Sequence, residues 1–96
     1  MRMPWTRRRV EASYTGYYVA PNGYILGPDP KYSGRFYVSN NHVVGPEHAG
    51  RFFLSDPPVA GVRYVYDTHI PRVHLDYYVT ATGHLYGPEQ RLPWFG

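Results

Sequence analysis

One motif recurs along this chain and limits the folds that are open to it. It runs from Tyr17 to Pro28 and returns from Tyr77 to Pro88, and a copy shorter by one residue spans Phe36 to Pro46. Each copy starts with two aromatic residues and Val, passes a turn signal, continues with a short apolar run and ends in Gly-Pro. Residues that prefer strands on both sides of a turn predict a β-hairpin. Its repetition predicts an array of hairpins.

The turn residues set the register of each predicted hairpin. Pro21-Asn22-Gly23 suits a three-residue loop, because Pro presets the first turn position and Gly accepts the left-handed one. Ala81-Thr82-Gly83 fits the same loop, and Asn40-Asn41 fits a loop of two residues. With these loops Val19 lies opposite Ile25, and the other two copies follow the same pairing.

Strand alternation then sorts the side chains onto two faces. The first face, which we expect to form the core, carries Tyr17, Val19, Ile25, Phe36, Val38, Val43, Tyr77, Val79 and Leu85. The second is rich in Tyr and His, and its candidate partner-binding residues are Tyr18, Tyr24, Tyr37, His42, Tyr78, His84 and Tyr86. Tyr favours partly solvent-exposed positions, since a buried hydroxyl needs a hydrogen-bond partner. Two interpretations stay open: this face packs on a neighbouring hairpin as a second core, or it docks a partner.

A degenerate fourth unit is predicted between the second and last copies. Arg51-Phe52-Phe53-Leu54-Ser55 resembles the start of the middle copy, and Val62 to Tyr66 would be its return strand. The stretch from Asp67 to Asp76 is either a strand with Pro71 at an edge or a long connection. We interpret the Gly-Pro pairs as the stop of each strand ladder, since Pro cannot donate a hydrogen bond to it.

The predicted fold is therefore all-β. Three to four short hairpins form a sheet, a sandwich or an open barrel, with extended arms at both termini. The expected parts are a basic arm over residues 1–12, a hairpin domain over 13–91 and an aromatic tail over 92–96. A chain of 96 residues without Cys has a small core and no disulfides to support it. We therefore expect a partner subunit to complete the core and to cover free strand edges.

The positive charge is concentrated at the N-terminus. The basic arm carries Arg2, Arg7, Arg8 and Arg9, whereas from Val10 onward six basic residues face seven acidic ones. Arg in such a run binds phosphates or an acidic protein surface, and the alternative is a solvated tail. Three aromatic residues near the termini, Trp5, Trp94 and Phe95, suggest arms that insert into neighbouring subunits.

Nothing in the sequence specifies a reaction. The chain has no Cys nucleophile, no phosphate-cradling glycine loop and no His-Glu-x-x-His motif, so we expect no enzyme activity and no cofactor. His69 and His74, with Asp67 and Asp76 nearby, could in principle bind zinc. Their spacing fits no helix face and no third ligand is predicted beside them, so we favour no metal site.

These observations favour a structural or interaction protein, a subunit of a larger assembly such as an accessory virion component that decorates or connects a capsid or tail. The alternative is a single-stranded nucleic-acid-binding module, which would stack bases on the tyrosine face and use the arginine arm. The N-terminus is basic without an apolar run after it, so we expect no signal peptide, synthesis in the cytosol and no membrane partner. The expected final location is a virion or another large assembly.

Overall fold

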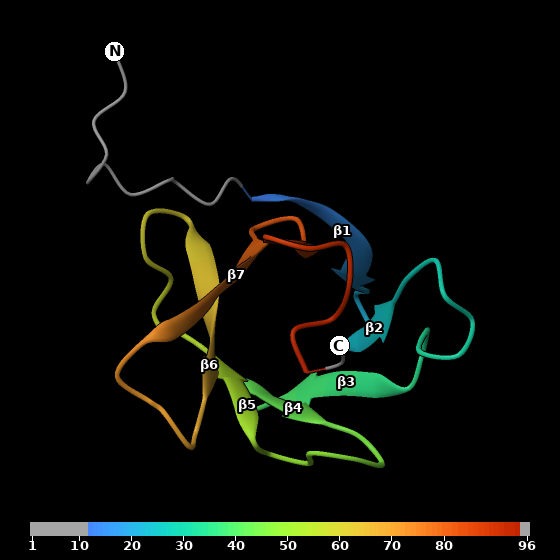
Figure 1. Ribbon diagram of the computed structural model, residues 1–96, viewed down its shortest axis with the longest axis horizontal. Helices are drawn as coiled ribbons and strands as arrows, with labels where there is room; N and C mark the ends of the chain where they lie inside the picture. Colours follow the sequence, from blue (N-terminus) through green and yellow to red (C-terminus); the bar gives the residue numbers. More distant parts are fainter. Residues whose placement is uncertain (1–11, 95–96) are drawn as a thin grey trace, which may run out of the picture.

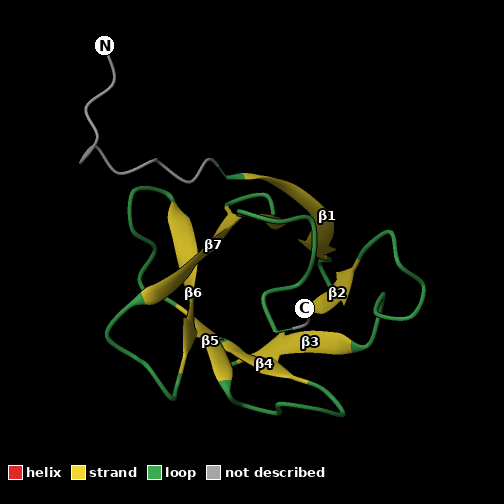
Figure 2. Ribbon diagram, in the orientation of Figure 1, coloured by secondary structure: helices red, strands yellow, loops and turns green. Residues whose placement is uncertain are grey.

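The computed structural model describes residues 12–94, and within them the protein is all-β (Figures 1 and 2). The eight strands are β1 (Ser13–Val19), β2 (Tyr24–Leu26), β3 (Phe36–Ser39), β4 (His42–Val44), β5 (Phe52–Leu54), β6 (Val62–Asp67), β7 (His74–Thr80) and β8 (His84–Gly87). Each strand pairs in antiparallel fashion with the next, and the order closes into a barrel. No helix long and apolar enough to cross a membrane occurs in residues 12–94.

Closure of the barrel depends on the pairing of β8 with β1. Ser13 lies opposite Gly87 and Tyr14 opposite Tyr86, before a bulge shifts the register. At the bulge Thr15 is buried, and its hydroxyl donates to the Leu85 carbonyl at 2.8 Å. A closed sheet has no edge strand. The expectation that a partner must cover free edges is therefore wrong for the described strands.

The hairpin registers agree with the sequence prediction. Val19 pairs with Ile25 in the first hairpin, and the middle and last hairpins pair in the same way. Gly23 and Gly83 take positive φ values of 93° and 92° at the end of their three-residue loops. Asn40 and Asn41 both have positive φ, 51° and 65°, as a two-residue hairpin turn requires. Local turn chemistry thus fixes the pairing.

The fourth predicted unit is also a hairpin, formed by β5 and β6. Leu54 lies opposite Val65 and Phe53 opposite Tyr66. Of the two alternatives for the stretch after it, the connection is the observed one: residues 68–73 form a loop, and β7 begins at His74. The protein therefore consists of four hairpins around one axis.

The first face of the hairpins lines the barrel interior, as the sequence predicts. The buried apolar residues are Tyr17, Ile25, Phe36, Val43, Phe52, Leu54, Val65, Tyr77, Val79, Leu85 and Leu92. After β8 the chain returns across the barrel (red in Figure 1). There Leu92 is buried and the Trp94 ring lies 5.4 Å from Phe36 and 5.3 Å from Phe52. We expected Trp94 to reach a neighbouring subunit, whereas here it packs in the barrel of its own chain.

Glycines at the ends of three hairpins lie beneath an aromatic ring of the facing strand. A Cβ built on Gly27 would lie 2.0 Å from the Tyr17 ring, and one on Gly87 2.1 Å from the Tyr77 ring. Gly45 and Phe36 repeat this arrangement at 2.3 Å. The Gly of each Gly-Pro therefore makes room for the core aromatic, which the interpretation as a ladder stop had missed.

The two ends of the barrel differ. Because neighbouring strands alternate in direction, the four hairpin turns lie at one end, which we call the turn end. The links between hairpins lie at the other, the connection end, together with the segment that follows β8. These connections comprise residues 27–35, 45–51, 68–73 and 88–94.

Candidate functional site

Aromatic side chains occupy most outward positions on six neighbouring strands, from β4 through β8 to β1. We call this surface the aromatic belt. Its members are His42, Phe53, Tyr64, Tyr66, His74, Tyr78, His84, Tyr86, Tyr14 and Tyr18. All are exposed or partly buried, since they lie on the outside of the closed sheet. Of the two interpretations of the second face, packing of one hairpin on another does not occur among the described residues.

The rings of the belt touch in an unbroken series. Phe53 stacks on Tyr66 with ring centroids 5.3 Å apart, and Tyr78 stacks on Tyr86 at 5.5 Å with planes only 5° apart. The complete series is His42–Phe53, Phe53–Tyr66, Tyr66–His74, His74–Tyr64, Tyr64–Tyr78, Tyr78–Tyr86, Tyr86–Tyr14, Tyr14–His84 and His84–Tyr18. Such contacts stabilise a sheet by about 0.2–1 kcal/mol each. They also hold the belt in a defined shape.

The repeat explains why the belt exists. At each seam between hairpins, the second aromatic residue of one hairpin lies beside an outward ring of the preceding return strand. The four seam pairs are Tyr37 with Tyr24, Phe53 with His42, Tyr78 with Tyr64 and Tyr18 with His84. Tyr24 and Tyr37 form a pair apart from the belt, because aliphatic Leu26 and Val44 lie between them and its two ends.

The belt side chains are aromatic and partly exposed to solvent, and few charged groups lie among them. Tyr14 and Tyr18 keep 39% and 37% of their surface exposed. Partial burial, with Tyr18 and Tyr86 close by, raises the pKa of Tyr14, so this residue stays a neutral phenol. Arg63 is the sole Lys or Arg within the eight strands, and its Nε donates to the Ser55 carbonyl at 3.0 Å. It alternates with Tyr64 and so does not belong to the belt.

The belt histidines make local polar contacts. His42 Nδ1 lies 2.9 Å from the Asn40 carbonyl, and His84 Nδ1 lies 2.9 Å from the Thr82 hydroxyl. His74 stacks on Tyr64 at 4.3 Å, and its Nδ1 lies 3.7 Å from Asp76. Residues 12–94 contain no group of three or more His, Asp or Glu that could hold a metal ion.

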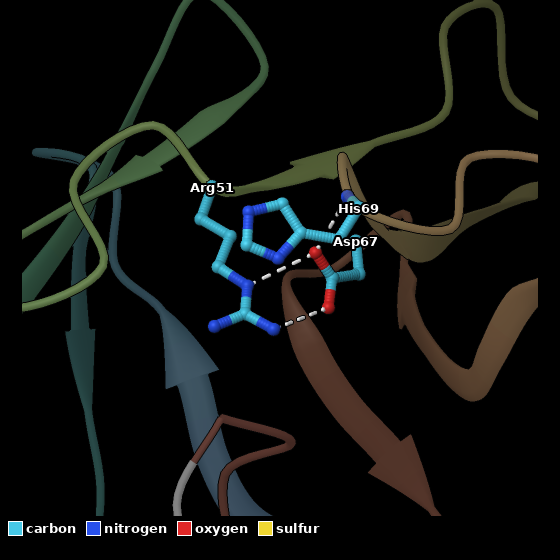
Figure 3. A network of polar contacts seen from close by, with 3 residues as sticks. All are labelled: Arg51, Asp67 and His69. Carbon is cyan, nitrogen blue, oxygen red and sulfur yellow. Dashed lines mark hydrogen bonds and ion pairs between the residues drawn. The ribbon is translucent and has the colours of Figure 1, made fainter.

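Asp67 forms an ion pair with Arg51 (Figure 3). Nε and Nη2 of Arg51 each donate to one carboxylate oxygen at 3.0 Å, and the His69 amide donates to Oδ1 at 2.9 Å. The Arg51 guanidinium, helped by that amide, holds the pKa of Asp67 below its usual range despite burial. The pair anchors the loop after β6.

A second feature is a cavity of about 330 Å³ at the connection end, which we call the rim pocket. It is lined by Tyr17, Pro28, Asp29, Tyr32, Gln90, Arg91 and Leu92. Burial and the nearby Asp29 carboxylate raise the pKa of Tyr17, so its hydroxyl stays protonated. Arg91 pairs with Glu89 at 2.6 Å. The rim pocket thus combines apolar walls with carboxylate, amide and guanidinium groups.

The structure brings five of the seven predicted face residues into the belt and leaves Tyr24 and Tyr37 as a separate pair. The belt residues that the sequence interpretation missed are Tyr14, Phe53, Tyr64, Tyr66 and His74. Alternation in the β5–β6 hairpin would have found three of them. Tyr14 and His74 lie beyond bulges, at Gly16 and Asp76, where simple counting fails. The predicted arm residues Arg2, Arg7, Arg8 and Arg9, with Trp5 and Phe95, lie outside the described residues.

Comparison of the chain with protein-family models, with curated proteins and with solved structures gives no match. The functional argument therefore rests on the belt and the rim pocket.

Proposed function

We propose that this protein is a non-enzymatic subunit of a larger protein assembly, and that the aromatic belt binds a neighbouring subunit, a second copy of the chain. The single observation that carries the proposal is the unbroken series of outward rings from His42 to Tyr18. Protein interface cores are enriched in aromatic residues and depleted in charged ones. An outer barrel surface with this composition supports binding to another protein.

The chemistry of the belt also supports a second copy as the partner. The same surface on two copies can meet about a two-fold axis, provided that it does not repel itself. The outward positions of the belt strands carry Asp76 as their sole charged group apart from histidine. Tyr and His offer ring faces, edges and hydrogen-bonding groups, so the surface complements itself.

Nucleic-acid binding is the weaker candidate. Stacking of single-stranded bases on aromatic rings requires cationic groups along the same groove to follow the phosphates. Of the arginines and lysine in the described chain, Arg35, Arg51 and Arg91 pair with carboxylates. The belt itself contains no Lys or Arg, and Arg72, in the loop before β7, lies two residues from the belt residue His74.

The experiment is the solution mass of the full-length chain by light scattering, for the wild type and for the double variant Tyr78→Ser/Tyr86→Ser. The wild type is expected to show a concentration-dependent mass above the 11.1 kDa of one chain. The double variant should associate at least about tenfold more weakly, since two central rings are removed.

The matched control is Tyr24→Ser/Tyr37→Ser, which removes two outward rings that lie apart from the belt. It should leave the belt-dependent association unchanged. Circular dichroism of each sample verifies that the β-sheet persists. Equal weakening by both double variants, or a wild type that stays monomeric, would contradict the proposal. Binding of single-stranded DNA that the Tyr78→Ser/Tyr86→Ser variant loses would favour the nucleic-acid alternative instead.

A further inference from the structure

The loop between β6 and β7 presents an unusually apolar tip. Val73 and Ile70 keep 64% and 56% of their surface exposed, the highest values among the large apolar residues of the described chain. Pro71 and Arg72 lie between them and are exposed as well. We call residues 70–73 the loop tip. Exposed apolar groups in a cluster are typical of an interaction site.

The start of the loop that carries the loop tip is held in place by hydrogen bonds at the end of β6. Asp67, at the end of β6, receives the two hydrogen bonds from Arg51 and one from the His69 amide. Its carbonyl accepts the Ile70 amide at 2.9 Å, and the Arg51 carbonyl accepts the Thr68 amide at 2.8 Å. A loop that is ordered before binding loses less conformational entropy when it binds. The loop is therefore preorganised as a docking element.

Arg72 and Asp29 are two of the charged residues of the described chain that make no ion pair. Lys31, which lies over the Tyr32 ring, and Asp56, which accepts from the Asn41 amide, are others. Three arginines pair with carboxylates, as described above, and Arg63 donates to a carbonyl. Among residues 12–94, Arg72 makes no ion pair. Asp29, in the rim pocket, receives the Lys31 amide on Oδ1 at 3.0 Å and makes no ion pair with a described side chain. The loop tip thus offers an unpaired cation, and the rim pocket an unpaired carboxylate.

The rim pocket is an open hollow with room for side chains of the loop tip. Its apolar walls come from Tyr17, Tyr32, Pro28 and Leu92, and its volume of about 330 Å³ equals that of roughly ten water molecules. Apolar side chains that enter such a space release this water and bury apolar surface. Ile70, Arg72 and Val73 line the same side of their loop, so they would approach the pocket together.

The loop tip and the rim pocket both lie at the connection end, on opposite sides of the barrel. Figure 1 shows loop 68–73 at the lower left and connection 27–35, which carries Asp29 and Tyr32, at the right. Two barrels that meet end to end about a two-fold axis therefore place each loop tip over the other copy's rim pocket. We propose that the protein forms such a dimer, in which Ile70 and Val73 enter the partner copy's pocket and Arg72 pairs with Asp29 there. Each contact occurs twice.

This end-to-end contact is distinct from the lateral contact proposed for the belt. The experiment therefore uses the full-length chain that also carries Tyr78→Ser/Tyr86→Ser, in which association through the belt is weakened. Sedimentation equilibrium should still show twice the 11.1 kDa mass of one chain in this background. Loss of belt association with retention of the dimer would separate the two proposals.

The decisive test is a charge exchange between the two sites. Arg72→Glu places a carboxylate opposite Asp29 and should weaken the dimer at least about tenfold. Asp29→Arg should weaken it similarly, because two arginines then meet. The chain with both substitutions restores opposite charges, and its dimer constant should return to within about threefold of the starting value. Failure of the exchange to restore dimerisation, with both single variants folded, would refute the pairing.

Three further variants test the charge of Asp29 and the apolar loop tip separately. Asp29→Asn retains an oxygen that can accept the Lys31 amide, so it keeps the local turn while it removes the charge. It should weaken the dimer less than Asp29→Arg. Ile70→Asp should weaken the dimer, whereas Val59→Asp, a change of an equally exposed apolar residue at the turn end, should not. An equal effect of Ile70→Asp and Val59→Asp would mean that the loop tip has no specific role.

Discussion

The third hairpin along the chain, β5–β6, differs from the other three at one register position, and the difference shows how one residue changes what a hairpin does at the end of the barrel. In the other three hairpins a glycine lies beneath the inward aromatic ring of the facing strand. In the third, the residue opposite Phe52 is Asp67. The Phe52 ring packs against Trp94 and His48, and the Asp67 carboxylate forms an ion pair with Arg51.

The exchange of glycine for Asp67 changes what the barrel end can do. A ring over glycine fills the end of the core, and the glycine offers no side-chain group to the connection that follows. A carboxylate at the same place instead provides hydrogen-bond acceptors for the next loop, as the His69 amide shows. All four hairpins thus contribute to the barrel, and the irregular one also anchors the loop that follows it.

The largest loss of stability is expected where a glycine of a regular hairpin lies beneath a core ring. Gly87→Ala places a methyl group 2.1 Å from the Tyr77 ring, so the core ring or the strand must move. Overpacking of this kind costs about 3 kcal/mol. Chemical unfolding of the purified variant measures the loss. Gly50→Ala is the matched control, since its Cβ meets nothing within 4 Å and its φ of +75° costs only about 1 kcal/mol of strain. Equal losses of unfolding free energy in the two variants would show that the aromatic ring above Gly87 is not the reason for a glycine at this position.

Two arginines at equivalent places sharpen the comparison, because each precedes the first aromatic residue of its hairpin. Arg51 pairs with Asp67, whose side chain is only 8% exposed, whereas Arg35 pairs with Glu47, whose side chain is 36% exposed. Arg51→Ala leaves a buried carboxylate without its cation and should lower the melting temperature clearly. Arg35→Ala should change it little, since exposed pairs contribute little. Indistinguishable melting temperatures for the two variants would contradict the anchoring role of Asp67.

The pairing of Arg51 with Asp67 also predicts how stability depends on pH. The pKa of Asp67 is lower in the folded protein than its ordinary value near 4, so its contribution to stability is present above that pH and is lost as the pH falls through the folded value. Without Arg51, burial raises the pKa of Asp67. Relative to the wild type, the Arg51→Ala variant should therefore recover stability as the pH is lowered from 7 towards 4. Melting curves across this range measure the difference, and a constant gap would refute it.

The smallest effect on stability is expected at the belt. Tyr18→Ser removes an outward ring that contacts His84 at 6.1 Å and is 37% exposed. A cross-strand pair on such a surface contributes about 0.5 kcal/mol, so the free energy of unfolding should change by no more than about 1 kcal/mol. A loss as large as that of Gly87→Ala would show that the belt belongs to the core. Chemical unfolding distinguishes the two outcomes.

The sequence predicts the hairpins and their faces because turns and alternation are local. Pro21-Asn22-Gly23 and Asn40-Asn41 set the registers without help from distant residues. Closure of the barrel depends on contacts between Ser13 and Gly87, far apart in the chain, and no local pattern specifies it. The sequence interpretation also missed the packing of a ring over each glycine, because the ring belongs to the facing strand and not to the residues next to the glycine. Likewise, the burial of Asp67 follows from its place opposite Phe52.

The most direct test of the central claim, that the aromatic belt is a docking surface between copies, is a nuclear magnetic resonance dilution series on the ¹⁵N-labelled full-length chain. The account predicts that the signals of Tyr14, Tyr78 and Tyr86 shift with concentration, while that of Val59 at the turn end does not. Concentration-dependent mass without any shift of the belt signals would contradict the claim, as would signals that stay constant throughout.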